Sequence, residues 1–83
     1  PEDVQALRRA YVALGKLDVD ERIVFTLRYL EQMTVDEAAD ACGVSPATVK
    51  RRLTRAEQRF SALAREDPVL RTWVDESPRW REG

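Results

Sequence analysis

The stretch TVDEAADACGVSPATVKRRLTR, residues 34–55, contains the signals that decide the fold. Thr34, followed three residues later by Glu37, forms a capping box, which marks the first turn of a helix. Gly43 then supplies a residue that tolerates the left-handed backbone of a tight corner. Ser45 is a favourable N-cap for a second helix. A short capped helix, a glycine corner and a longer capped helix together predict a helix-turn-helix.

The helix that follows Ser45 is predicted to be long and two-faced. Pro46 suits its first position, where a missing N–H group costs nothing. Apolar residues recur at spacings of four and three, and they are Val49, Leu53, Ala56, Phe60 and Leu63. This seam predicts a helix of about 19 residues that the pair Asp67-Pro68 ends. Val44 and Val49 are expected to pack across the cap as a hydrophobic staple, and small Ala39 marks the crossing of the two helices.

Further helical segments surround this pair. The first is expected from Asp3 to Leu14, with Val4, Leu7, Tyr11 and Leu14 on its buried face and Gly15 at its end. The second is expected from Val19 to Glu31, capped by Asp18, with Ile23, Val24, Leu27 and Leu30 as its buried stripe and Phe25 and Tyr29 as a second apolar pair. A last short helix is expected from Val69 to Glu76, with residues from Ser77 onward irregular.

These segments predict an all-α fold, a small bundle of about four helices. The helix-turn-helix relates it to the winged-helix-like DNA-binding class, here without strands. We expect residues 1–66 to form the DNA-binding domain and residues 67–83 to be a C-terminal extension. Because the chain begins with Pro1 and not with Met, we expect it to be part of a longer protein.

Charge is distributed unevenly along the chain. The net charge is only −1, which argues against a general polyanion binder. Residues 47–65, however, contain six basic side chains and the single acid Glu57, a local charge of about +5, whereas residues 31–40 contain four acids and no base. The molecule is therefore strongly dipolar, with its positive charge on the second helix of the motif.

Composition excludes several classes of function. The single cysteine, Cys42, rules out an internal disulfide, fits a cytoplasmic protein and is expected to be a small core residue. The absence of histidine argues against a zinc site, and no cofactor is expected. No apolar run is long enough to span a membrane, and no set of nucleophile, base and acid indicates an enzyme.

The outer face of the helix that follows Ser45 predicts contact with DNA. Because the first residues of such a helix reach deepest into the major groove, Ala47, Thr48 and Arg51 are the candidates for reading base edges. The candidates for phosphate contacts are Lys50, Arg52 and Arg55, with a local carboxylate as the alternative partner of Arg52. Thr34 and the N-terminus of its helix are a further candidate phosphate site.

The run from Asp20 to Phe60 also resembles region 4 of bacterial sigma-70 family sigma factors, of the extracytoplasmic-function (ECF) type. The matching pieces are ERIVFTLRY, then MTVDEAA, then GVSPATVKRRLTRA. The resemblance implies promoter recognition at the −35 element and transcription initiation. It also implies docking on the β flap of RNA polymerase, through the helix from Val19 to Glu31 and the later part of the helix that follows Ser45, and binding by an anti-sigma factor. The family's usual Leu-Pro is replaced here by Leu17-Asp18.

Two other functions remain open at this point. A LuxR-type response-regulator output domain has a similar motif and binds DNA as a dimer. A protein-interaction module that kept the fold without binding DNA is the other alternative, motivated by the low net charge and by Trp73 and Trp80. These two tryptophans are either packed on the bundle or serve as a partner anchor.

Overall fold

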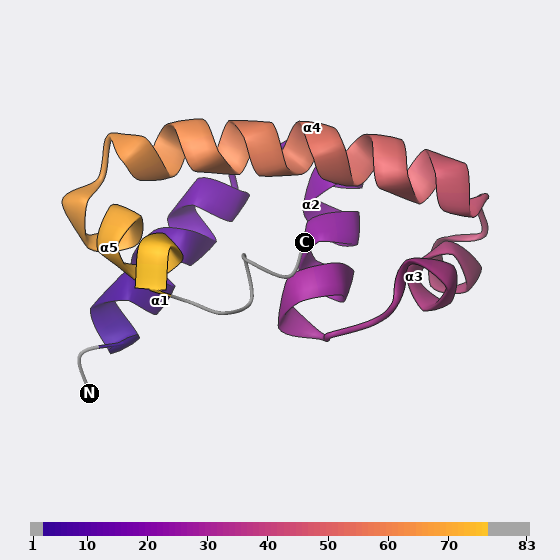
Figure 1. The fold of residues 1–83 in the computed structure, drawn as a ribbon, viewed down its shortest axis with the longest axis horizontal. Coiled ribbons are helices and arrows are strands. Elements are labelled where there is room, and N and C mark those ends of the chain that lie inside the picture. Colours follow the sequence, from indigo (N-terminus) through magenta and orange to yellow (C-terminus); the bar gives the residue numbers. More distant parts are fainter. Residues whose placement is uncertain (1–2, 77–83) are drawn as a thin grey trace.

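The computed structural model describes residues 3–76 as a small bundle of helices (Figure 1). In chain order the elements are α1 (Asp3–Leu14), α2 (Val19–Phe25), the π-helical turn η1 (Thr26–Leu30), α3 (Val35–Cys42), α4 (Pro46–Arg65) and α5 (Pro68–Glu76). Residues 3–76 contain no strand, so the predicted all-α class is confirmed. Over these residues the bundle has five α-helices where about four were predicted, because the last short helix expected after Pro68 also forms and packs on α1 and α4.

Helix α4 is the spine of the molecule, and all the other helices lie on one side of it (Figure 1). The reason is the seam predicted from the sequence. Its inward residues are buried, and they are Val49, Leu53, Ala56, Phe60 and Ala64. Helices α2 and α3 cover the first half of this seam, and α1 and α5 cover the second half (Figure 1). In the part of the chain that the structure describes, no helix packs on the opposite side of α4.

Three aromatic rings form the centre of the core. Phe25 lies between Tyr29 and Phe60, with ring centroids 4.9 Å apart in both pairs. All three side chains are buried. Aromatic residues bury large apolar areas and favour such tilted contacts, so this cluster joins α2 and η1 firmly to α4.

Helix α1 has the predicted bounds but buries a different face. Its buried residues are the small ones, Ala6, Ala10 and Ala13, together with Leu14. Val4, Leu7 and Tyr11, predicted to be inside, are 49%, 42% and 59% exposed. Alanines let α1 approach its neighbours closely, whereas the large side chains on the adjacent face would hold it away. The helix therefore packs through its alanine stripe and leaves an apolar face outside.

The second helix begins as predicted and departs from prediction at its end. Asp18 is the N-cap residue before Val19, although its side chain makes no capping hydrogen bond. At the other end the last turn widens into η1, where the Glu31 N–H group donates to the Thr26 carbonyl over 3.0 Å, five residues back. Gln32 follows with a positive φ of 59°, and no local sequence signal indicated this ending. Ile23, predicted to be buried, is 43% exposed, whereas Val24 is fully buried.

Helix α5 begins at Pro68, one residue earlier than predicted. Asp67 caps it, because its carboxylate accepts from the N–H groups of Val69 and Leu70 over 3.0 and 3.3 Å. Leu70 is buried in the core beside α1 and α4. The pair Asp67-Pro68 thus ends one helix, as predicted, and starts another.

Some predictions stay open. The division at residue 66 stays a prediction, although α5 packs on α1 and α4. The position of Trp80 lies outside the described residues, and the Trp73 side chain is likewise not described. Within residues 3–76 no helix combines the length and apolar character that crossing a lipid bilayer requires.

Candidate nucleic-acid interface

The corner between α3 and α4 has the geometry expected of a helix-turn-helix. At the start of α3, Thr34 and Glu37 form both hydrogen bonds of the predicted capping box, over 2.9 and 3.1 Å. At its end Gly43 is left-handed, with φ 69°. The Val44 N–H group reaches back to the Ala39 carbonyl over 3.1 Å, which closes a Schellman-type ending. The corner is therefore fixed by backbone hydrogen bonds, and a side chain at position 43 would be strained.

Helix α4 begins at the predicted cap and crosses α3 at close range. The Ser45 hydroxyl accepts from the Thr48 N–H group over 3.2 Å, and Pro46 takes the first helical position. Ala38 and Ala39 of α3 are buried, as is Val49 of α4. Small residues on α3 and a branched one on α4 set the crossing, so the outward side of α4 projects away from α3.

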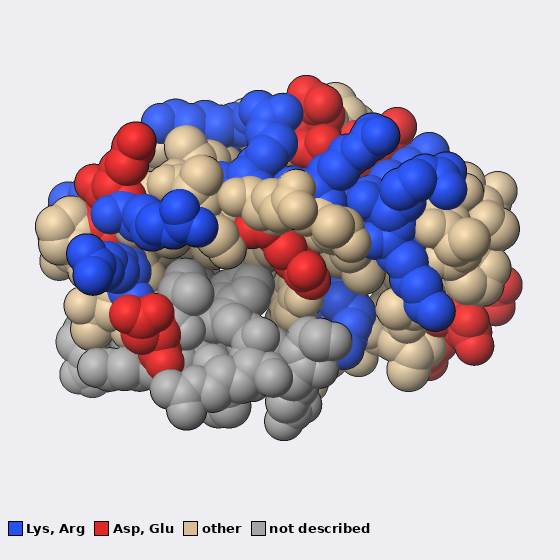
Figure 2. Space-filling view, turned by 45° about the horizontal axis from the view of Figure 1, so that its top comes forward, with Lys and Arg blue, Asp and Glu red and all other residues tan. Residues whose placement is uncertain are grey.

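The outward face of α4 is cationic (Figure 2). We use this term for the predicted site residues Ala47, Thr48, Lys50, Arg51 and Arg55. All are exposed except Thr48, which is half-buried. Lys50, Arg51 and Arg55 make no ion pair within residues 3–76. Figure 2 shows basic side chains gathered at the end of α4 nearest α3. The charge of these three residues is thus uncompensated.

Arg52 lies differently, on the flank of α4 that faces α2. Its guanidinium is 3.7 Å from the Asp20 carboxylate, and its side chain is only 29% exposed. The sequence had left open a phosphate or a local carboxylate as its partner, and the structure places the carboxylate beside it. Arg52 reaches a phosphate only if it leaves Asp20, so it is the weakest of the phosphate candidates.

Arg59 extends this flank toward the connection between α1 and α2. It donates to the Lys16 carbonyl over 3.1 Å and lies 3.7 Å from Asp18 and 3.8 Å from Glu21. The Glu21 side chain is only 8% exposed, and its Oε1 atom has no hydrogen-bond partner among the described residues. Arg59 is therefore the nearest compensation for a buried carboxylate. Sequence analysis did not find this cluster, because it joins residues 43 positions apart.

The N-terminus of α3 remains a candidate anion site with competing charge. The Thr34 N–H group and hydroxyl are both engaged by Glu37. The helix itself offers no partner to the N–H groups of Val35 and Asp36. Asp36 and Glu37 both stand in this first turn, and they would repel a phosphate. Of the candidate phosphate contacts, the one at Thr34 has the least electrostatic support.

An inward hydrogen bond removes the one acid of residues 47–65 from the outward face. The buried Tyr29 hydroxyl donates to the carboxylate of Glu57, which is half-buried. Burial of the phenol, and then this bond, raise the pKa of Tyr29 above its ordinary value. The acid is thus held toward η1, and the outward face keeps its positive charge.

Comparison with known families helps to distinguish the functions that this geometry could serve. The family model described as Sigma-70, region 4 matches residues 7–60. The chain belongs to this sigma factor family. The match begins within α1 and ends at Phe60 in the second half of α4, so it contains both helices of the motif and the corner between them. No curated protein and no solved structure matched the chain.

Membership of the family carries several general properties. This form of region 4 is typical of ECF sigma factors, and the family takes part in transcription initiation without being enzymatic. Region 4 domains generally bind the −35 promoter element and RNA polymerase. The match favours the sigma factor over the response-regulator alternative.

Proposed function

We propose that this domain directs promoter selection by laying the first turns of α4 in the major groove of a −35 element. The observation that supports the proposal is the difference between the cations on two faces of α4. Cations on the outward face have no carboxylate partner among the described residues, whereas Arg52 and Arg59 on the flank have one. An uncompensated cationic helix face, exposed beside a fixed corner, suits a phosphate-lined groove.

Within this proposal some residues of α4 contact base edges in the major groove and others contact phosphates. Arg51 faces outward one turn into α4 and reads a guanine edge through two hydrogen bonds. Ala47, exposed in the first turn, contacts a thymine methyl group. Lys50 and Arg55, on either side, hold phosphates and fix the position of the helix.

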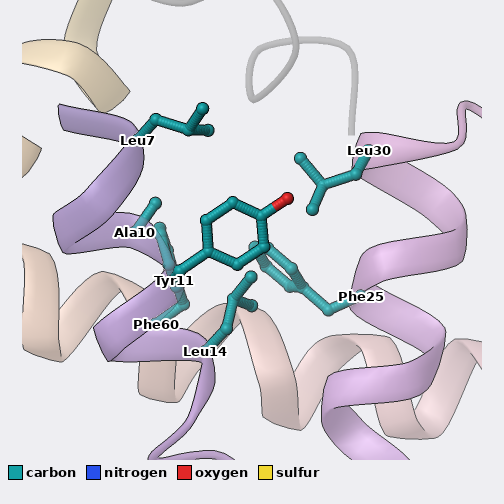
Figure 3. Close-up of a pocket in the computed structure, with 7 residues that line it drawn as sticks. All are labelled: Leu7, Ala10, Tyr11, Leu14, Phe25, Leu30 and Phe60. Atoms are coloured by element: carbon teal, nitrogen blue, oxygen red, sulfur yellow. The ribbon is translucent and has the colours of Figure 1, made fainter. Parts of the chain in front are cut away.

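A second surface supports docking to RNA polymerase. An apolar groove runs between α1 and the α2–η1 helix, with Phe60 of α4 at its floor (Figure 3). Its lining residues are Leu7, Ala10, Tyr11, Leu14, Phe25, Leu30 and Phe60. An amphipathic helix of the polymerase β flap is the occupant that we propose, because Leu7 and Tyr11 are exposed at the rim of this small groove and can pack against the apolar face of a helix. An anti-sigma factor that covers this groove would compete with the polymerase.

This location overlaps the flap surface that the resemblance implied, because Phe25, Leu30 and Phe60 line it, but it adds residues of α1. The later part of α4 is covered by α1 and α5, so most of its apolar side chains are unavailable. The large exposed apolar side chains lie instead on α1, as a consequence of the alanine-stripe packing, and on α2, where they are Val19 and Ile23. A Tyr11→Glu substitution should therefore weaken capture of the polymerase β subunit in a pull-down, with Val12→Glu, on a neighbouring face, as the matched control.

DNA binding is tested by fluorescence anisotropy of the 83-residue chain with a labelled duplex selected from a randomised pool. Each phosphate contact contributes about 0.9 to the slope of log affinity against log salt, so Arg55→Ala should reduce the slope by about 1. Arg52→Ala should change the slope less, because Asp20 already neutralises that side chain. A slope that is near zero for the natural sequence would refute the proposal.

The protein-interaction alternative makes the opposite prediction. If the domain acts only through the apolar groove, removing Arg51 and Arg55 leaves promoter-dependent transcription in a reporter assay unchanged. Loss of transcription, with helicity by circular dichroism and β-subunit capture both intact, would eliminate this alternative.

A further inference from the structure

A small hydrogen-bond network occupies the first turns of α4. Thr48 stands at its centre. Its N–H group donates to the Ser45 hydroxyl over 3.2 Å, and its own hydroxyl oxygen accepts from Ser45 over 3.1 Å and from the Arg51 guanidinium over 3.3 Å. The network therefore links the cap of the helix to the outward arginine one turn later.

The chemistry of a hydroxyl limits what Thr48 can do for DNA. A threonine hydroxyl has one donor hydrogen and two acceptor lone pairs. Both acceptor positions are filled by Ser45 and Arg51. The Thr48 oxygen therefore has no free lone pair to accept a hydrogen bond from a base, and only its O–H hydrogen remains to donate.

The partner of Arg51 also differs in kind from the partners of the flank arginines. Arg52 and Arg59 face carboxylates, which cancel their charge. Arg51 is held by a neutral hydroxyl and makes no ion pair within residues 3–76. A neutral acceptor restricts the guanidinium and leaves its charge, together with its remaining N–H donors, available to a ligand.

We propose that Thr48 is a positioning residue for base reading: its hydroxyl orients the Arg51 guanidinium before DNA arrives and thereby sets the strength of a guanine preference. The inference rests on the proposed function, and it reassigns Thr48 from a base-reading role to one that acts through Arg51. A free arginine loses much side-chain freedom on binding, and ordering it in advance reduces that loss. The effect appears in sequence-specific binding only.

The test compares two substitutions at Thr48 in the 83-residue chain. Thr48→Val keeps the shape and removes the hydroxyl, whereas Thr48→Ser keeps the hydroxyl. With the duplex selected from a randomised pool, Thr48→Val should weaken specific binding by roughly 3- to 10-fold, as expected for a lost ordering contact. Thr48→Ser should bind nearly as the natural sequence does. Affinity for a duplex of unrelated sequence should not change with either substitution, and the thermal midpoint by circular dichroism should not change with Thr48→Ser.

A double-mutant cycle with Arg51→Ala separates positioning from direct contact. If Thr48 acts through Arg51, adding Thr48→Val to Arg51→Ala causes no further loss of specific binding. An equal loss in both backgrounds would show an independent DNA contact and overturn the proposal. An unchanged affinity of Thr48→Val alone, or a loss that Thr48→Ser shares, would also overturn it.

The same measurements distinguish failure of this inference from failure of the proposed function. If the natural sequence selects no motif from the pool, or if Arg51→Ala binds as the natural sequence does, promoter reading by α4 itself is wrong. If Arg51→Ala loses the guanine preference while Thr48→Val retains it in full, only the positioning role is wrong.

Discussion

Two sides of the same helix use arginine in opposite ways. On the outward face of α4, Arg51 and Arg55 have no carboxylate partner in the described part of the chain. On the flank toward α2, Arg52 and Arg59 lie within 3.7–3.8 Å of Asp20, of Asp18 and of the buried Glu21. Some arginines of α4 thus stabilise the fold, and others remain available to a ligand.

The difference comes from the neighbours and not from the arginines. The start of α2 brings its acidic residues against one flank of α4, so any cation on that flank is neutralised by the fold. Within residues 3–76 no element covers the outward face. The net charge counted along residues 47–65 is therefore larger than the positive charge available to a nucleic acid. Nearby carboxylates decide which of these cations remain available.

The largest effect is expected from removing the outward cations together. Arg51→Ala with Arg55→Ala should cost about 2–3 kcal/mol of DNA-binding free energy, on the order of 100-fold, since a base-reading pair and a phosphate contact are both lost. Circular dichroism should show an unchanged melting midpoint, because neither side chain supports the fold through an ion pair. A lowered melting midpoint would show that Arg51 and Arg55 stabilise the fold, which would contradict the comparison.

For Arg59, on the flank of α4, we expect a loss of folding stability. Arg59→Ala should lower the free energy of unfolding by about 1–3 kcal/mol, because the buried Glu21 carboxylate loses its nearest cation; the half-exposed position of Arg59 keeps the effect below that of a fully buried pair. Urea denaturation measures this. Arg55→Ala is the matched control, one turn away on the same helix, and should leave stability within about 0.5 kcal/mol. Equal destabilisation by both variants would contradict the division.

Alkaline pH should reveal the hydrogen bond that holds Glu57 inward. The folded protein raises the pKa of Tyr29 through burial and the bond to Glu57, so the unfolded chain ionises first, near its ordinary pKa of 10.0. The contribution is fully present below pH 10 and is lost as the pH rises above it. Urea denaturation at pH 8 and near pH 10.5 should therefore show a stability decrease that is smaller in Tyr29→Phe. A decrease of the same size in both proteins would refute this role for Tyr29.

The smallest effect is expected at an exposed pair far from the interface. Arg9 donates to Asp67 over 2.9 Å and holds the pKa of that carboxyl below its ordinary value. Asp67 then stabilises the fold above its ordinary pKa, and this contribution is lost as the pH falls through the lowered pKa. Asp67→Asn should lower the thermal midpoint slightly at pH 6, with the difference from the natural sequence vanishing near pH 2. A difference that persists there would show that capping, and not charge, dominates at this site.

Local signals in the sequence were sufficient for the helix-turn-helix. The cap at Thr34, the left-handed Gly43, the cap at Ser45 and the buried seam from Val49 were all predicted, because each depends on residues a few positions apart. The exposed side of α4 followed from the seam. The predicted base-reading and phosphate-binding roles remain predictions.

Features that depend on distant neighbours were not predictable in the same way. In α1 two adjacent faces both have helical spacing, and the larger apolar side chains favour burial of the face with Val4, Leu7 and Tyr11. The structure buries the alanine face, because close approach to α4 and α5 needs small side chains. The π-helical turn, the Arg59–Glu21 contact and the Tyr29–Glu57 bond also need the packed fold, since each joins or reshapes elements with no local signature.

The account is tested most directly by following the arginine side-chain Nε–H signals of the 83-residue chain by NMR while a selected −35 duplex is added. We expect the Arg51 and Arg55 signals to shift strongly and become protected, while the Arg59 signal changes little because it stays with Lys16, Asp18 and Glu21. Large shifts at Arg59 with unchanged signals at Arg51 and Arg55 would contradict the claim that the outward face of α4 meets the DNA.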